Sequence, residues 1–369
     1  MNFQTVNEST VLEVLKIVKD PDLNRDIVSL GFIKDLKIGV DGRVAFSIEL
    51  TTPACPVKDQ MRDQAQAAVE QVPGVTAVDI TMTASVRSAA GPDAGRMPVD
   101  GVKNVIAVGA GKGGVGKTTL AVNLAIALAK SGGKVGLIDG DIYGPNIPLM
   151  LGIEGSLTTD GKKILPAEKY GLQVISMAFM TTSDAPVIWR GPMLHGVITQ
   201  FFREVRWSAL DYLIVDLPPG TGDIALSLSQ TVQAAGAVVV TTPQTVSLAD
   251  SRRAIMMYQK LNIPVLGLIE NMSHFVCPSC LHESDIFGQG GGEAMSTELG
   301  IPFLGSIPIY EPIRVGGDTG VPLTVSEPDS PAGRAFRFAA EAVAAQVSIA
   351  SYQKTVPLTP SNESKVPPG

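Results

Sequence analysis

The chain has 369 residues, enough for two domains, and its net charge of −7 argues against a broad surface for DNA or anionic membranes. No apolar run approaches the ~18–20 residues that a transmembrane helix needs, and the polar N-terminus is unlike a signal peptide. Three cysteines are too few for a disulfide framework, whereas 45% apolar residues and 38 glycines suit an α/β protein with tight turns. We therefore expect a cytoplasmic protein whose partners include neither nucleic acid nor membrane.

Residues 1–88 predict a small α+β domain, because stretches of helical and strand-like periodicity both occur there. The expected elements are two helices and two strands, at 10–19, 58–71, 44–50 and 75–82. Residues 89–101 contain small residues, proline and glycine without periodicity, and we expect them to form an interdomain linker.

Cys55 lies just ahead of the second expected helix of this domain. A helix N-terminus can lower the pKa of a thiol, which would permit a transient contact with a metal or with sulfur. A half-buried, unreactive thiol is the alternative, and the sequence does not separate the two.

The central motif of the chain is a phosphate-binding loop. Gly111 to Thr118 fits G-x-x-x-x-G-K-[ST] and lies between an apolar strand-like run and a long Ala/Leu-rich helical pattern. The glycines let backbone N–H groups surround phosphate oxygens, and the helix N-terminus adds free donors. Lys117 is expected to reach the β- and γ-phosphates, and the Thr118 hydroxyl to bind Mg²⁺. The residues expected to hold the nucleotide are Gly111, Gly113, Gly114, Val115, Gly116, Lys117, Thr118 and Thr119.

Residues 102–347 alternate short strand-like runs with helical ones, which predicts a mainly parallel sheet wrapped by helices, an α/β fold. Ligands of such sheets bind at the carboxyl ends of the strands. The expected strands lie near 105–109, 134–139, 172–178, 212–217, 236–242, 264–270 and 302–307.

Two of these strand ends carry acidic residues. Asp139 and Asp141 follow one strand, and acids in that position can polarise an attacking water or support the Mg²⁺ shell. Asp216 ends a run of apolar residues like a Walker B strand, with its carboxylate directed at Mg²⁺ through water. The glycines after it are expected to place the Gly220 amide near a γ-phosphate. A helix cap is the other common role of an acid at a strand end.

Cys277 and Cys280 form a C-x-x-C pair between two of the three histidines, His274 and His282. Two thiolates supply half of the ligands that a zinc ion or an iron–sulfur cluster needs. Three arrangements remain open: two pairs around a 4Fe–4S cluster in a dimer, a zinc ion completed by the histidines, or a redox dithiol. The pair lies in a Gly/Ser-rich region, whereas a redox C-x-x-C normally opens a helix.

Taken together, these motifs resemble the Mrp/ApbC iron–sulfur cluster carriers, which share a deviant Walker A loop with MinD, ParA, ArsA and the nitrogenase iron protein. The resemblance covers roughly residues 102–345 and rests on GKGGVGKTT, D-x-D, WRGP, and ENM followed by CPSC. The stretches DPDLNRDIVSLGFIKDL and TTPACPVKDQM resemble the small domain of metal–sulfur cluster assembly factors. Some Mrp/ApbC proteins carry that domain in front of the ATPase.

The resemblance implies roles for several residues. It implies that Lys112 crosses a two-fold interface to the partner's nucleotide in an ATP-sandwich dimer. It further implies that Asp141 orients or deprotonates the attacking water, with Asp139 on the Mg²⁺ shell, and that Asn271 reads the adenine. Residues 307–310 are expected on the other side of the base. Asn146 stands where the family more often has serine.

The favoured function is therefore that of an ATPase that carries iron–sulfur clusters. A homodimer would hold a labile cluster, expected to be 4Fe–4S, between its Cys277 and Cys280 pairs. It would receive the cluster from scaffold proteins and pass it to apo-proteins. The alternatives are a ParA/MinD-like positioning ATPase and a P-loop ATPase with a structural zinc. Residues 348–369 are Pro/Ser-rich and are expected to form a disordered tail rather than a membrane-binding tip.

Overall fold

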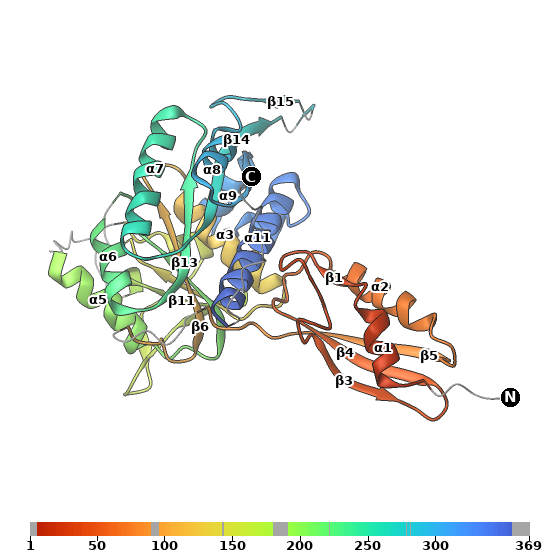
Figure 1. Ribbon diagram of the computed structural model, residues 1–369. Coiled ribbons are helices and arrows are strands. Elements are labelled where there is room, and N and C mark those ends of the chain that lie inside the picture. The colour runs from red at the N-terminus through yellow and green to blue at the C-terminus, as the bar shows by residue number, and fades with distance from the viewer. Residues whose placement is uncertain are drawn as a thin grey trace, which may run out of the picture.

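The computed structural model describes residues 6–89, 96–141, 144–179, 191–220, 222–277, 279–280 and 282–355. The chain forms a smaller N-terminal domain and a larger domain beside it (Figure 1). Among the described residues, no helix is both long and apolar enough to span a bilayer.

The N-terminal domain packs two helices against a three-stranded sheet in the order β3-β4-β5. The side chain of Asn7 caps the first helix by accepting a hydrogen bond from the Thr10 N–H at 2.8 Å. In the central strand, alternate residues from Val44 to Leu50 are buried, which is the period of a strand with one face on the core. The elements are α1 (Glu8–Leu15), β1 (Lys19–Asp20), β2 (Arg25–Asp26), β3 (Ile33–Ile38), β4 (Arg43–Leu50), α2 (Lys58–Glu70) and β5 (Ala77–Ala84).

The larger domain is built on one sheet, which has nine strands within the described part of the chain. Its order is β10-β11-β7-β12-β6-β13-β14-β15, and β16 also pairs with β14. The central strands pair in parallel and are buried along nearly their whole length, as near-continuous apolar runs require. The strands are β6 (Val102–Ala110), β7 (Val135–Asp139), β10 (Ala167–Lys169), β11 (Leu172–Ser176), β12 (Leu210–Asp216), β13 (Ala234–Thr241), β14 (Val265–Val276), β15 (Glu283–Ser284) and β16 (Phe303–Ile309), with β8 (Thr158–Thr159) and β9 (Ile164–Leu165) forming a separate pair.

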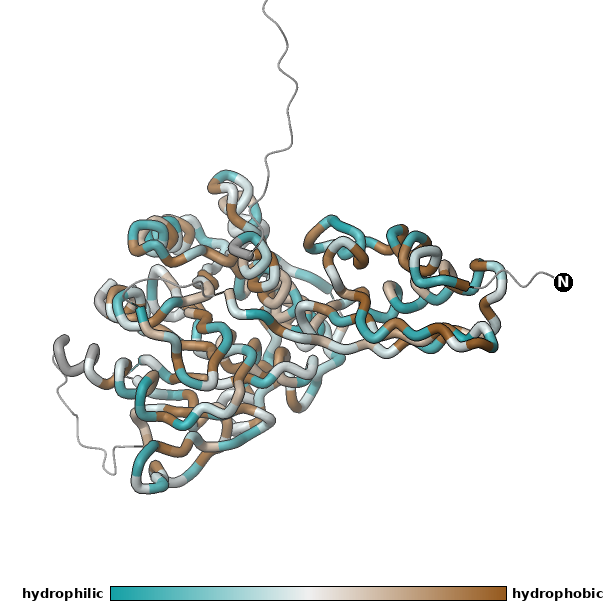
Figure 2. Tube along the Cα trace, turned by 60° about the horizontal axis from the view of Figure 1, so that its bottom comes forward, coloured by the Kyte–Doolittle hydropathy of each residue, from teal (hydrophilic) through white to brown (hydrophobic). Residues whose placement is uncertain are grey.

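Helices cover both faces of this sheet (Figure 1). Separate apolar cores lie on the two faces, and brown apolar segments run through the interior of the domain in Figure 2. One face carries α3 (Lys117–Lys130), α4 (Ile147–Leu151), α10 (Leu323–Ser326) and α11 (Pro331–Thr355), with α9 (Glu311–Thr319) packed on α4 and α10. The other carries α5 (Gly191–Arg203), α6 (Gly222–Thr231), α7 (Thr245–Lys260) and α8 (Gly291–Leu299), and the short helix η1 (Met177–Phe179) follows β11. The expected α/β fold with a mainly parallel sheet is confirmed.

Two expected boundaries differ from the structure. Helix α11 continues to Thr355, so the disordered tail expected from residue 348 is wrong for residues 348–355, and 356–369 lie outside the described residues. Ser348 and Ser351 in this extension are buried, whereas composition alone suggests that polar residues here are exposed to solvent. The expected linker 89–101 is packed at both ends, since Ala89 and Val99 are buried.

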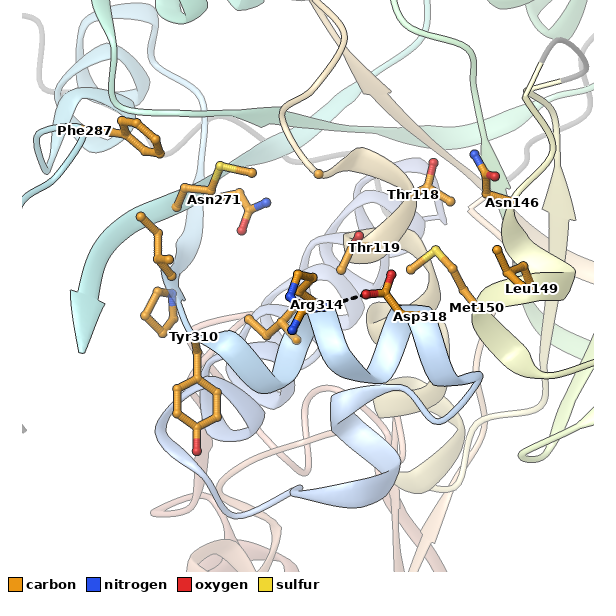
Figure 3. Close-up of a pocket in the computed structure, with 16 residues that line it drawn as sticks. Thr118, Thr119, Asn146, Leu149, Met150, Asn271, Phe287, Tyr310, Arg314 and Asp318 are labelled. Carbon is orange, nitrogen blue, oxygen red and sulfur yellow. Dashed lines mark hydrogen bonds and ion pairs between the residues drawn. The ribbon is translucent and has the colours of Figure 1, made fainter. Parts of the chain in front are cut away.

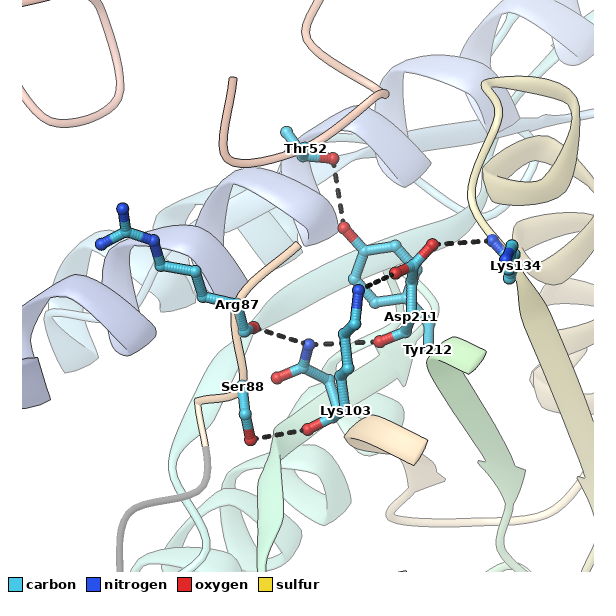
Figure 4. Close-up of polar contacts among 8 residues, drawn as sticks. Thr52, Arg87, Ser88, Lys103, Lys134, Asp211 and Tyr212 are labelled. Carbon is cyan, nitrogen blue, oxygen red and sulfur yellow. Dashed lines mark hydrogen bonds and ion pairs between the residues drawn. The ribbon is translucent and has the colours of Figure 1, made fainter. Parts of the chain in front are cut away.

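The interface between the two domains contains both hydrogen bonds and apolar contacts. The hydroxyls of Thr52 and Tyr212 lie 3.1 Å apart and are both buried (Figure 4). Tyr352 of α11 donates a hydrogen bond to the Leu30 carbonyl at 2.8 Å, and the Arg87 guanidinium lies over its ring. Ala54 of the N-terminal domain is buried within the core of the larger domain. The last helix therefore contacts both domains.

Candidate nucleotide and metal–thiol site

The expected phosphate loop lies between β6 and α3, at the carboxyl end of the sheet. Gly114 and Gly116 have positive φ angles of 81° and 80°, a conformation that favours glycine. Gly111 lies so close to the backbone of Asp250 that a Cβ would stand 2.2 Å from its carbonyl carbon. A cavity of about 160 Å³ opens over the loop, lined by Lys112, Gly113, Gly114, Val115, Gly116, Lys117, Thr118, Thr119, Asp141 and Pro219.

The side chains of Lys117 and Thr118 both bind Asp216. The Lys117 ammonium forms a short ion pair with one Asp216 oxygen, and the Thr118 hydroxyl donates to the other at 2.7 Å. Lys117 is 6% exposed and Asp216 fully buried. Burial raises the pKa of the Asp216 carboxyl, and the Lys117 charge opposes that rise. The loop and the end of β12 therefore form one charged cluster.

Asp139 lies beside Asp216, because β7 and β12 pair in register at these two residues. One Asp139 oxygen accepts hydrogen bonds from the Ile147 N–H at 3.2 Å and the Ser176 hydroxyl at 3.0 Å. Its Oδ1 is buried and has no hydrogen-bond partner within the described residues. Burial, followed by repulsion from Asp216, raises the pKa of Asp139 to about 7.

Mg²⁺ fits this group of residues. Two neighbouring carboxylates and the Thr118 hydroxyl form an all-oxygen donor set, which Mg²⁺ prefers. A cation would also relieve the repulsion between Asp139 and Asp216 and satisfy the orphaned Asp139 Oδ1.

The two switch residues predicted from sequence lie differently around the phosphate cavity. Asp141 is partly exposed and lines the cavity together with Lys112. The Gly220 N–H, expected near a γ-phosphate, instead donates to the Ala110 carbonyl at 3.2 Å. Gly220 lines a neighbouring cavity of about 200 Å³, between the phosphate loop and α7.

A larger cavity of about 490 Å³ adjoins the phosphate loop and shares Gly116, Thr118 and Thr119 with the smaller one (Figure 3). Asn271 lines it and donates a hydrogen bond to the Val115 carbonyl at 2.8 Å. Asn146 and the expected residues around Tyr310 line it too. Its mixed apolar and polar wall suits the base and ribose of a nucleotide.

Sequence reasoning missed several residues of this cavity. Phe287 comes from the segment after the cysteine pair, and Arg314 and Asp318 form an ion pair at 2.7 Å on α9. None of the three belongs to a local motif with a known mechanism, so only the tertiary structure could have identified them.

The cysteine pair lies at the turn of a hairpin formed by β14 and β15. Phe275 pairs with Ser284 and Val276 with Glu283, and the Cys277 N–H donates to the His282 carbonyl at 3.0 Å. Cys277 is partly exposed and Cys280 exposed. Hydrogen bonds from the backbone amides of Cys280 and Ser279 lower the pKa of the Cys277 thiol, which favours the thiolate form that binds metals.

The zinc site considered from the sequence, with both histidines as ligands, is not formed. No group of three or more His, Cys, Asp or Glu side chains among the described residues is arranged to hold a metal ion. His274 instead shares a hydrogen bond with the Ser273 hydroxyl at 2.8 Å. Trp189 and Arg190 of the WRGP stretch lie outside the described residues, and its last two residues begin α5.

Comparisons with known proteins identify both domains. Residues 101–344 match the ParA family described as NUBPL iron-transfer P-loop NTPase, and residues 8–80 match the family described as iron–sulfur cluster assembly protein. An iron–sulfur cluster carrier protein of Synechocystis is 49% identical over 92% of this chain and 98% of its own length. One from Deinococcus radiodurans is 47% identical over 92% of this chain and 95% of its own.

Solved structures resemble the larger domain. A nucleotide-binding protein from Archaeoglobus fulgidus, in complex with ADP, is 36% identical with a TM-score of 0.56, covering 64% of this chain and 92% of that one. The cell division ATPase MinD of Pyrococcus furiosus is 26% identical with a TM-score of 0.50, covering 65% of this chain and 98% of that one. With its deviant phosphate loop, its C-x-x-C thiol pair and these relatives, the chain belongs to the iron-transfer P-loop NTPases of the Mrp/ApbC iron–sulfur cluster carrier type, preceded by an iron–sulfur cluster assembly domain.

Proposed function

We propose that two copies of this chain bind Mg·ATP, hold an iron–sulfur cluster between their Cys277 and Cys280 pairs, and pass it to apo-proteins. The names of the relatives support the role of cluster carrier. The observation that carries the link to ATP is strand β14, which places Asn271 at the nucleotide cavity and ends one residue before Cys277.

The thiol pair supports a site shared between two chains. Each chain offers two thiolates, and a 4Fe–4S cluster takes four. The hairpin is exposed at Cys280, and the lowered pKa of Cys277 favours the form that binds iron. A two-fold axis near the hairpins would bring the four sulfurs together.

ATP turnover is assigned to the residues around the phosphate loop. Lys117 would neutralise charge on the phosphates, with Thr118, Asp139 and Asp216 holding Mg²⁺. Asp141 lines the phosphate cavity and would orient the attacking water. Lys112, in the same cavity wall, would contact the nucleotide of the partner chain. The Gly220 amide would leave the Ala110 carbonyl to contact a γ-phosphate.

The test is anaerobic reconstitution of the full chain with iron and sulfide. Wild type is expected to take up one cluster per two chains, with the mass of a dimer by light scattering. The variant Cys277→Ala/Cys280→Ala is expected to lose the cluster absorbance, whereas Cys55→Ala keeps it, because Cys55 is buried in the other domain. Unchanged iron and sulfide content in the double variant would refute the assignment.

A further inference from the structure

The hairpin that carries the cysteines also builds part of the nucleotide cavity. Its outgoing strand, β14, contributes Asn271 and Met272 to the cavity wall. Its returning arm, after β15, contributes Phe287. Figure 3 shows the Phe287 ring and the Asn271 amide on the same side of the cavity. Both arms of the hairpin therefore face the same cavity.

The returning arm is fixed at its two ends. At the cysteine end, Ser284 pairs with Phe275, and the Cys277 N–H binds the His282 carbonyl. At the other end, the buried Glu270 carboxylate accepts hydrogen bonds from the Gly290 N–H at 3.0 Å and the Gly292 N–H at 2.6 Å. Phe287 lies between these anchors, so its position is linked to that of the cysteines by a short, constrained segment.

Phe287 is incompletely packed by the protein. Its side chain is 41% exposed although it lines the cavity. A flat purine offers the aromatic face that such a ring prefers, and stacking would remove apolar surface of both partners from water. Ile286 is more exposed, at 57%, but does not line the cavity.

We infer that Phe287 contacts the base of the bound nucleotide and thereby couples nucleotide occupancy to the geometry of Cys277 and Cys280. The base restrains Phe287, Phe287 restrains the returning arm, and the arm restrains the hairpin turn. Because coupling between sites is reciprocal, occupation of the thiols in turn alters nucleotide affinity. The biological meaning of this coupling rests on the proposed function, but the coupling itself requires no cluster.

The experiment uses the full chain without iron. ADP affinity is measured by calorimetry with Mg²⁺ present, and the alkylation rates of Cys277 and Cys280 by iodoacetamide are measured by mass spectrometry with and without saturating Mg·ADP. Slow alkylation of the buried Cys55 reports that the chain stays folded during the measurement. The variants are Phe287→Ala, its neighbour Ile286→Ala as matched control, and Phe287→Tyr as the conservative replacement.

In wild type, Ile286→Ala and Phe287→Tyr, Mg·ADP is expected to slow alkylation of the pair. In Phe287→Ala, ADP affinity is expected to fall about tenfold, which is the effect of losing one stacking contact. Mg·ADP is then expected to give Cys277 and Cys280 no protection from alkylation, even at ADP concentrations that saturate the variant. If the ADP affinity of Phe287→Ala is too low for the variant to be saturated with ADP, Phe287→Leu is used in its place. Wild-type affinity or wild-type protection in the alanine variant would overturn the inference. Since no iron is present, this result is independent of whether the thiols hold a cluster.

Discussion

At the scale of single residues, the two aspartates of the D-x-D stretch differ in how deeply they are buried. Asp139 is fully buried, hydrogen-bonded by Ile147 and Ser176, and close to Asp216. Asp141 is partly exposed and faces the phosphate cavity. Only the second can meet a water molecule approaching from the cavity.

The variant Asp141→Asn is therefore expected to lower ATP hydrolysis on the order of 100-fold while leaving ADP affinity unchanged. The amide keeps the size of the side chain but cannot accept a proton from water. Phosphate release under multiple-turnover conditions and ADP calorimetry measure the two effects. A hydrolysis rate within twofold of wild type would remove Asp141 from the reaction.

Cys55 shows how burial decides between two interpretations that sequence leaves open. Its side chain is 6% exposed, and burial raises its pKa to about 11 despite the nearby start of α2. The desolvation cost of the thiolate thus exceeds the stabilisation from the backbone hydrogen bond of Val57. The unreactive interpretation is the one that this environment favours.

In the Cys277→Ala/Cys280→Ala variant, where Cys55 is the remaining thiol, we expect slow alkylation of the native chain at pH 9 and an increase toward pH 11. Because the native pKa is raised, the folded state favours the protonated thiol. The contribution of the protonated Cys55 thiol to the free energy of unfolding is fully present below about pH 9 and is lost as the pH rises through about 11. The alkylation rates of Cys55 measured in urea give the reference for the unfolded chain. Equal rates in native and unfolded protein at pH 9 would contradict the expected protection.

At the scale of elements, the sequence predicted the strands of the larger domain better than its binding cavity. Each expected strand from β6 to β16 exists, because a strand buried on both faces reads as a short apolar run. The phosphate loop follows β6 directly, and Asp216 is the last residue of β12. Phe287 and Glu270 could not be assigned, since their roles arise from contacts that fold back across the hairpin.

Glu270 offers a test of the hairpin's anchor. Replacing it by glutamine removes the charge that binds the Gly290 and Gly292 amides at the start of α8. We expect hydrogen exchange across 285–292 to accelerate by about tenfold, since charge-assisted bonds contribute about 1.5–3 kcal/mol. Mass spectrometry of exchanged peptides measures this effect.

The matched control is Glu283→Gln, an exposed glutamate on β15. It should leave exchange in residues 285–292 unchanged. Equal exchange in the two variants would show that the Glu270 contacts do not hold the segment.

At the scale of the whole molecule, two tyrosine hydroxyls form hydrogen bonds between the N-terminal domain and the ATPase domain, beside the apolar contact around Ala54. Tyr212 meets Thr52, and Tyr352 meets the Leu30 carbonyl. Burial raises the pKa of Tyr212 to about 12, so the hydroxyl remains a neutral hydrogen-bonding group over the physiological range.

The double variant Tyr212→Phe/Tyr352→Phe is expected to weaken the association of the two domains. The loss of two neutral hydrogen bonds makes the free energy of this association less favourable by about 1–3 kcal/mol in total. Small-angle scattering should then report a larger radius of gyration. Tyr310→Phe is the control, because its hydroxyl binds Glu327 within the larger domain. If the double variant scatters like wild type, the apolar contact around Ala54 is sufficient to hold the domains.

Helix α11 has a consequence for the order in which this chain can fold. Its apolar side, with Phe336, Ala340 and Val343, covers the core next to α3, the helix that follows the phosphate loop. During synthesis this helix leaves the ribosome after every other described element of the domain. Helix α3 therefore stays uncovered on this side until α11 has been synthesised, so completion of the nucleotide site waits for α11.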